Sequence, residues 1–233
     1  MLSLLGLAVL VGMHHALEAD HVAAVSSLAA GKKRMSDMVA HGLTWGFGHT
    51  VTLFLFAGVA LVLGHAVPET LATRLEAAVG IMLVCLGGHV LWRLWRDRVH
   101  FHSHRHEEGE AHFHAHSHTL ETMPHERSPH HHAHRINWRT LFVGMTHGMA
   151  GSAALLLLTV TQIRGPWEGL AYVLLFGIGS MLGMAVVSAA IGVPLTLTAR
   201  FLTWANRGLQ AALGVTTIVI GASTIHATIF AAL

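Results

Sequence analysis

Long apolar stretches make up most of this 233-residue chain, and short polar segments separate them. A helix needs about 20 apolar residues to cross a bilayer. Six stretches reach that length, and they lie near residues 2–30, 41–64, 75–95, 139–163, 168–196 and 208–231. The pattern therefore predicts an all-α integral membrane protein with six transmembrane helices.

Short motifs recur in the same order in the two halves of the chain. The matched segments are 12–17 with 144–149, 46–49 with 177–180 and 75–80 with 209–214, at offsets of 132, 131 and 134. Each half holds three predicted spans, so the halves would enter the membrane from opposite sides. Inverted repeats are typical of secondary transporters, whose binding sites lie near the midplane. The alternative is a chance likeness between glycine-rich membrane helices.

The domain organisation follows from this repeat. A first three-helix repeat is predicted over residues 1–95 and a second over residues 139–233. A polar, histidine-rich segment over residues 96–138 joins them. It contains few aliphatic residues and cannot bury a core, so we expect it to be disordered in isolation.

Composition agrees with a membrane location. The chain is 53% hydrophobic and only 11% charged, whereas a soluble domain carries about 25% charged residues. The net charge of +2 is small and the basic residues are local, so no nucleic-acid partner is expected. Cys85 is the single cysteine, which excludes an internal disulfide.

The basic residues also predict an orientation. Twelve of the 14 lie in or beside the first, third and fifth loops between the predicted spans. The positive-inside rule then places those loops in the cytoplasm and both termini outside. The expected location is the cell (inner) membrane, crossed several times, with the first span retained and not cleaved as a signal peptide.

Histidine is unusually abundant, and it falls into two groups. Of 22 histidines, 13 lie between His100 and His134. Their alternating pattern offers many weak, exchangeable ligands for transition metals. The plainer interpretation is a solvated linker.

A second group of polar residues interrupts the first apolar stretch. It comprises His14, His15, Glu18, Asp20 and His21. Ionisable side chains at membrane depth are costly and usually functional, and imidazole with carboxylate suits a divalent transition metal. On a regular helix His14, Glu18 and His21 would share one face, whereas His15 and Asp20 would not. Either the helix is distorted here, or some of the five act by orienting the others.

Two further histidines are candidates to complete a metal site. They are His49 in the second predicted span and His147 in the fourth. The repeat aligns His147 with His15. Two other interpretations of the cluster remain open, a buried polar network that locks helices together and a proton relay.

The motifs resemble those of the nickel/cobalt transporter (NiCoT) superfamily. The segment from His15 to His21 is similar to its His-x4-Asp-His signature, with Glu18 where the family has aspartate. Gly48-His49-Thr50 resembles its second-helix motif, and residues 147–155 resemble the UreH-like nickel permease branch. The histidine-rich segment is similar to the loop of the nickel/cobalt efflux branch. The resemblance implies Ni²⁺ or Co²⁺ translocation that uses His15, Asp20, His21 and His49, although typical members have more spans.

The functional prediction is a permease for Ni²⁺ or Co²⁺, not an enzyme, with uptake favoured over efflux. The expected partners are the metal ion, the lipid bilayer and, as a candidate, a cytoplasmic metallochaperone; no cofactor is expected. An intramembrane zinc hydrolase is the alternative from another class, but the chain lacks a His-Glu-x-x-His motif. A storage or sensing protein that uses only the histidine-rich segment is a further alternative. No Gly-x4-Gly-Lys-Ser/Thr motif is present, so the chain has no ATPase of its own by this criterion.

Overall fold

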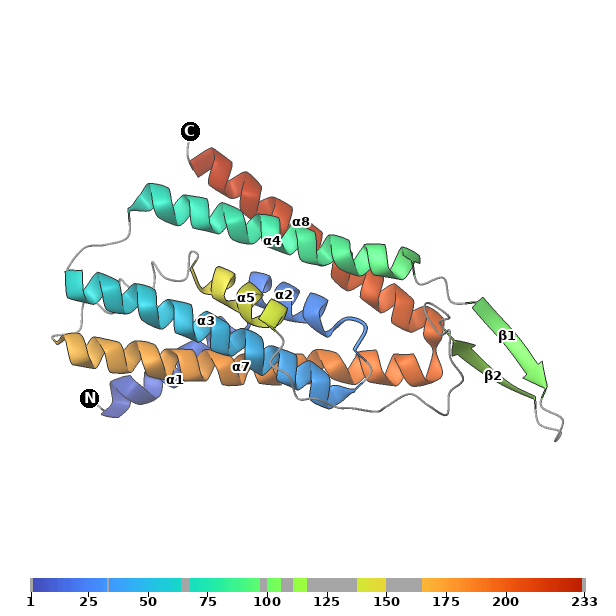
Figure 1. Cartoon of the computed structure of the whole chain (residues 1–233). Helices are drawn as coiled ribbons and strands as arrows, with labels where there is room; N and C mark the ends of the chain where they lie inside the picture. Colours follow the sequence, from blue (N-terminus) through green and yellow to red (C-terminus); the bar gives the residue numbers. More distant parts are fainter. Residues whose placement is uncertain are drawn as a thin grey trace.

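The computed structural model describes residues 2–32, 34–63, 68–96, 100–105, 111–116, 138–149 and 165–231. Within them the chain forms seven helices and one antiparallel pair of strands (Figure 1). The elements are α1 Leu2–His15, α2 Ala19–Ala29, α3 Met35–Leu63, α4 Glu69–Arg96, β1 His100–Arg105, β2 Ala111–His116, α5 Trp138–Gly148, α7 Pro166–Phe201 and α8 Thr203–Ala231.

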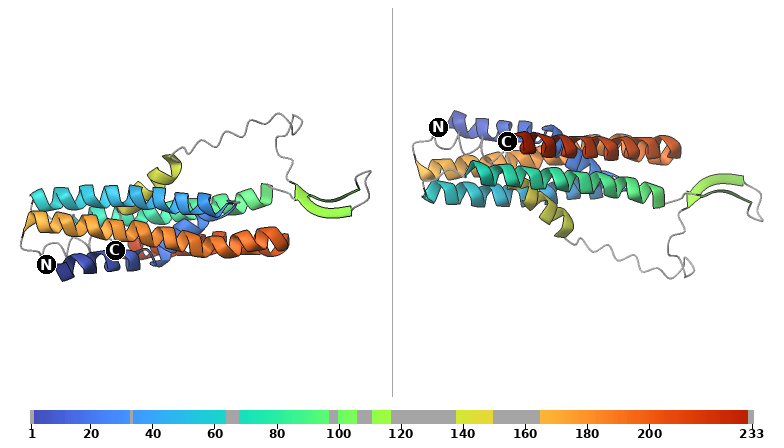
Figure 2. Two further views of the ribbon diagram at one scale, coloured as in Figure 1. Left: turned by 90° about the horizontal axis from the view of Figure 1, so that it is seen from below. Right: turned by 90° about the horizontal axis from the view of Figure 1, so that it is seen from above.

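The four longest helices run alongside one another as an elongated bundle (Figures 1 and 2). Each contains a segment long and apolar enough to cross a membrane: Met35–Val59, Thr70–Arg96, Trp167–Ala199 and Thr203–Phe230. Large apolar side chains such as Ile81, Val186 and Phe230 are more than half exposed on their outer faces. Such faces are unfavourable in water and suited to lipid, which agrees with the predicted second, third, fifth and sixth spans.

The first predicted span is not one continuous helix. It is divided into α1 and α2 by residues 16–18, where Glu18 is extended (φ −60°, ψ 146°). The N–H groups of Leu17 and Glu18 donate to the carbonyls of His14 and His15 at 2.9 and 3.1 Å. The Glu18 carbonyl accepts from Val22 N–H at 2.9 Å. The break therefore leaves these backbone groups paired, as an apolar environment requires.

The short helix α2 lies inside the bundle. It contacts α3, α4, α7 and α8, and seven of its residues are buried. The largest apolar core forms around it, where Ala24 and Val25 pack with Trp45 of α3, Leu83 of α4 and Met184 of α7. The polar residues at the start of α2 are thereby held in the interior.

Polar contacts fix the other end of α2. Gly31 follows it with φ +79°, the left-handed conformation that glycine adopts without strain. Arg93 Nη2 of α4 donates to the Ala30 carbonyl at 2.7 Å, and Ser27 Oγ lies 2.9 Å from Thr217 Oγ1 of α8. These contacts attach α2 to the α4–α8 pair.

The fourth predicted span and the histidine-rich segment are described in part. Helix α5 covers the first residues of the predicted span 139–163, and residues 150–164 lie outside the described part. In the segment 96–138, β1 and β2 pair with His100 opposite His116. The expected disorder of that segment stays a prediction for its other residues.

Candidate metal site

Four imidazoles from four helices meet at the break between α1 and α2. His15 ends α1, His21 lies in the first turn of α2, His49 lies in the middle of α3, and His147 is near the end of α5. All four are buried, with at most 4% of each residue exposed. The ring of His21 lies 4.2 Å from that of His15, 5.1 Å from that of His49 and 4.4 Å from that of His147, centroid to centroid.

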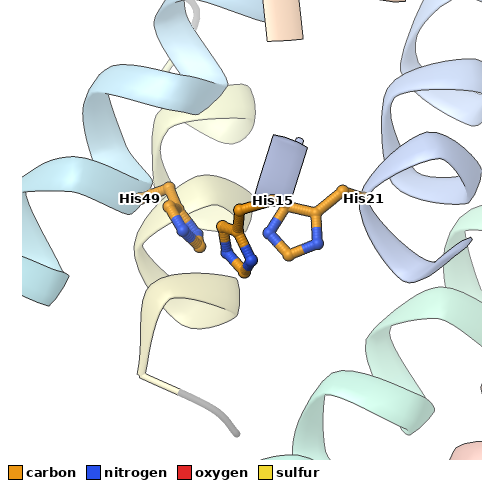
Figure 3. A group of neighbouring side chains, drawn as sticks. All are labelled: His15, His21 and His49. Atoms are coloured by element: carbon orange, nitrogen blue, oxygen red, sulfur yellow. The ribbon is translucent and has the colours of Figure 1, made fainter. Parts of the chain in front are cut away.

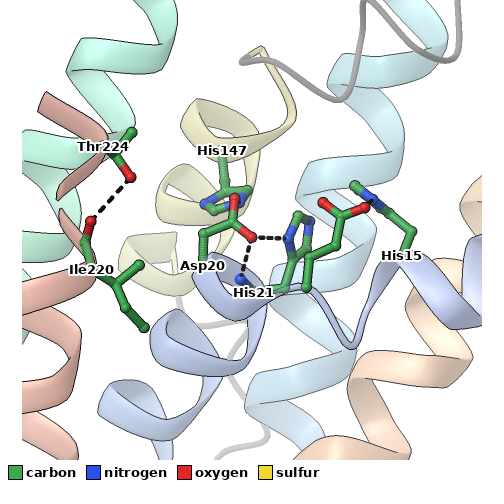
Figure 4. Close-up of polar contacts among 7 residues, drawn as sticks. His15, Asp20, His21, His147, Ile220 and Thr224 are labelled. Atoms are coloured by element: carbon green, nitrogen blue, oxygen red, sulfur yellow. Dashed lines mark hydrogen bonds and ion pairs between the residues drawn. The ribbon is translucent and has the colours of Figure 1, made fainter. Parts of the chain in front are cut away.

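The ligand atoms fall into two overlapping groups. His15, His21 and His49 form the first group (Figure 3). Asp20, His21 and His147 form the second (Figure 4). Within each group the ligand atoms lie within 4.8 Å of one another. Metal–nitrogen bonds are about 2 Å long, so small side-chain rotations would close either group on one ion.

Two carboxylates orient two of the three imidazoles of the first group. His15 Nδ1 donates to Glu18 Oε1 at 2.8 Å, and His21 Nδ1 donates to Asp20 Oδ1 at 2.8 Å. The backbone N–H of His21 also donates to Asp20 Oδ1 at 2.8 Å. A carboxylate on one ring nitrogen fixes the ring and leaves the other nitrogen available to a metal. The Nε2 atoms of both rings are thereby prepared as ligands.

The remaining ring nitrogens support the same interpretation. Among the described residues, Nε2 of His15, Nε2 of His21 and both ring nitrogens of His49 are buried without a hydrogen-bond partner. Each such atom costs about 1–3 kcal/mol. A divalent ion bound by one nitrogen of each ring would satisfy three of them, so the donor set fits a transition-metal ion.

Asp20 joins the two groups. Its Oδ2 accepts a hydrogen bond from His147 Nε2 at 3.1 Å while its Oδ1 accepts from His21 (Figure 4). One carboxylate from the first half of the chain therefore positions imidazoles from both halves.

A tryptophan that the sequence analysis did not single out forms one wall of the site. Trp45 is fully buried, and its ring lies 5.5 Å from His21, 5.8 Å from His49 and 5.2 Å from His147. Its indole ring gives all three imidazoles an aromatic neighbour. The sequence does contain a signal for this role, because Trp45 lies one helical turn before His49 in the same predicted span.

The structure brings together six of the seven candidate ligands. They are His15, Glu18, Asp20, His21, His49 and His147. His14 is exposed on α1 and belongs to neither ligand group. The regular-helix geometry that paired His14 with His21 does not apply, because the helix is broken. The sequence left two explanations open, a distorted helix and carboxylates that orient the imidazoles. The structure shows the break in the helix and also hydrogen bonds from imidazoles to Glu18 and Asp20.

Four helices long and apolar enough to span a membrane, around an interior of imidazole and carboxylate, fit the class of membrane proteins with a candidate transition-metal site. The chain belongs to the NicO family, described as high-affinity nickel-transport protein, whose profile matches residues 1–232. It is therefore a metal-ion transporter and not an enzyme, which confirms the predicted class and resemblance and removes the support for a zinc hydrolase.

Two relatives illustrate the family. The urease accessory protein UreH of Bacillus sp. (strain TB-90) is 35% identical over 210 residues, which cover 90% of this chain and 85% of that protein. The chloroplast protein FOR GROWTH AND FERTILITY 1 of Arabidopsis thaliana is 25% identical over 185 residues, covering 78% and 48% respectively. No solved structure matches the chain.

Proposed function

We propose that the protein is a secondary permease that carries Ni²⁺ across the cell membrane into the cytoplasm, and that His15, His21 and His49 bind the ion. One observation carries the proposal: three imidazoles, whose buried nitrogens have no hydrogen-bond partner in the described part of the chain, converge at a helix break in a nickel-transport family member. Imidazole is a suitable ligand for nickel.

The charges near the site favour a divalent ion. Glu18 and Asp20 each contact an imidazole, and Asp20 contacts two. With the imidazoles neutral, the two ionised carboxylates carry two negative charges. A net charge within a bilayer is costly. A divalent cation would make the site neutral, whereas a monovalent ion would leave it charged.

Packing between helices supports the proposal of an inverted repeat. A Cβ added at Gly12 of α1 would overlap the carbonyl of Phe176 in α7, and one added at Gly144 of α5 would overlap the carbonyl of Trp45 in α3. Gly144 follows Gly12 by 132 positions, and Phe176 follows Trp45 by 131. Exchanging the two halves therefore converts one close contact into the other.

Close contacts between α4 and α8 support the proposed inverted repeat independently. A Cβ on Gly80 would meet the carbonyl of Gly221 at 2.8 Å, and one on Gly214 would meet that of Gly87 at 3.2 Å. Gly214 follows Gly80 by 134 positions, and Gly221 follows Gly87 by the same number. We therefore propose six spans arranged as two inverted halves, which alternate access to the site by rocking against each other.

The direction and orientation are also part of the proposal. The basic loops would face the cytoplasm, together with the segment 96–138, which would receive the ion or pass it to a metallochaperone. Uptake is favoured by the similarity to UreH, which is named as an accessory protein of urease. Efflux by the same site is the alternative, in which the histidine-rich segment would capture excess ions.

The test is the flux of radioactive nickel in vesicles reconstituted with the purified full-length chain. His49→Ala is expected to abolish flux because it removes one of three ligands. The matched control is His89→Ala, since His89 is exposed on α4, and it should transport as the wild type does. Absence of nickel flux in folded wild-type protein would contradict the proposal, and so would full activity of His49→Ala.

A further inference from the structure

We propose that the ion passes the site in two steps, held first by His15, His21 and His49 and then by Asp20, His21 and His147. His21 is the ligand common to both sets, and it keeps the ion bound while the other ligands exchange. This inference rests on the proposed permease function and adds to it a second station and an order of events.

The positions of the rings support two stations. The centroid of His21 lies almost equally far from His15, at 4.2 Å, and from His147, at 4.4 Å. Among the described residues no ring contact joins His15 to His147, so His21 lies between them. An ion held by His15 therefore reaches His147 by exchanging ligands at His21. A single composite site would instead need His15 and His147 on the same ion.

The proposed inverted repeat places the two stations on opposite sides of the membrane midplane. His15 and His147 are equivalent positions, 132 residues apart. Helix α1 runs along the bundle from the end that carries the N-terminus, whereas α5 lies obliquely against the middle of the bundle (Figures 1 and 2). Equivalent positions of an inverted repeat lie on opposite sides of the midplane. The His15 station would thus be reached from outside and the His147 station from the cytoplasm.

The chemistry of the second set agrees with a later step. The ligand nitrogens of the first set have no partner among the described residues. In the second set, His147 Nε2 and Asp20 Oδ2 already share a hydrogen bond at 3.1 Å. A neutral imidazole carries one proton, on either nitrogen, and His147 Nδ1 is buried without a described partner. The second set can bind when that proton lies on Nδ1, so entry of the ion replaces the hydrogen bond.

The experiment compares His15→Gln with His147→Gln in the full-length chain, with initial nickel flux measured in two orientations. Glutamine keeps a polar side chain of similar size. If a Gln variant does not reach the membrane, the Asn variant at the same position is used in its place. In right-side-out vesicles supplied with external nickel, His15→Gln should raise KM by about tenfold or more because it weakens the capture of the ion. His147→Gln should lower kcat by a similar factor and leave KM near the wild-type value.

In inside-out vesicles the roles should be exchanged, so that His147→Gln raises KM and His15→Gln lowers kcat. Equal changes in both variants and both orientations would overturn the relay in favour of one composite site. Wild-type kinetics in either variant would overturn it too. Absence of flux in the wild type would instead contradict the proposed function, so the two failures are distinguishable.

Discussion

Among single residues, His21 is central to the account because its ring touches His15, Trp45, His49 and His147. Its neighbour Asp20 fixes this ring and that of His147 with the two oxygens of one carboxylate. Glu18, whose side chain is 45% exposed, fixes only His15. The two carboxylates therefore differ in how much of the site depends on them.

This difference predicts unequal effects of neutral substitutions. Asp20→Asn should weaken nickel affinity by about 100-fold and Glu18→Gln by about tenfold, the range found when a residue that orients a metal ligand is lost. The asparagine removes a charge that supports two rings and also weakens a proposed ligand of the second set, whereas the glutamine affects one ring at a more hydrated position. The KM for nickel flux measures both changes, and an effect of Glu18→Gln equal to or larger than that of Asp20→Asn would contradict this account.

The chemical types of the ligands could be predicted from the sequence, because histidine and aspartate are conspicuous in an apolar segment. Their pairing could not. The hydrogen bond from His147 to Asp20 joins residues 127 positions apart, and it depends on how α5 docks beside α2. The exclusion of His14 depends on the broken helix, which the regular-helix geometry did not include.

Among the helices, the break between α1 and α2 is the feature that creates the site. It occurs at Ala16-Leu17-Glu18, three residues with good helix propensity. Packing in the bundle must override that propensity, which is why the sequence predicted one apolar span here and left its distortion as one of two alternatives. The long spans were predictable because length and apolar character alone determine them.

Helix α5 and its neighbour α3 approach each other closely at Gly144. Close packing at Gly144 predicts a position-specific cost. Gly144→Val would force side-chain atoms against the Trp45 carbonyl and should destabilise the protein by about 1–3 kcal/mol, as overpacking does. It should also reduce nickel flux, because α5 carries His147. The matched control is Gly88→Val, since nothing lies within 4 Å of a Cβ at Gly88. Thermal unfolding in detergent measures the effect, and equal melting temperatures for the two variants would contradict the packing argument.

For the whole molecule, membrane-embedded helices and the histidine-rich segment have separate roles in this account. Among the described residues, the candidate ligands lie on α1, α2, α3 and α5. The segment 96–138 connects the two halves and supplies no member of either described ligand group. In the proposed mechanism the transport step therefore requires the bundle, and the segment would act on ions before or after that step.

This separation predicts the outcome of removing the insert histidines. Replacing the 13 histidines between His100 and His134 by serine should leave the initial rate of nickel flux in vesicles within about twofold of wild type, because no ligand of the membrane site is lost. His15→Ala in the same background should abolish flux. Loss of flux on replacing the insert histidines alone would favour a storage or sensing role centred on that segment.

The most direct test of the central claim is nickel X-ray absorption on the full-length chain with those 13 histidines replaced by serine, so that the membrane site dominates imidazole ligation. With one equivalent of Ni²⁺ bound, we expect the spectrum to show imidazole ligands, and we expect His49→Ala to remove one of them from the wild-type set. An ion coordinated by oxygen alone, or an imidazole signal that His49→Ala leaves unchanged, would contradict the claim that His15, His21 and His49 bind the transported ion.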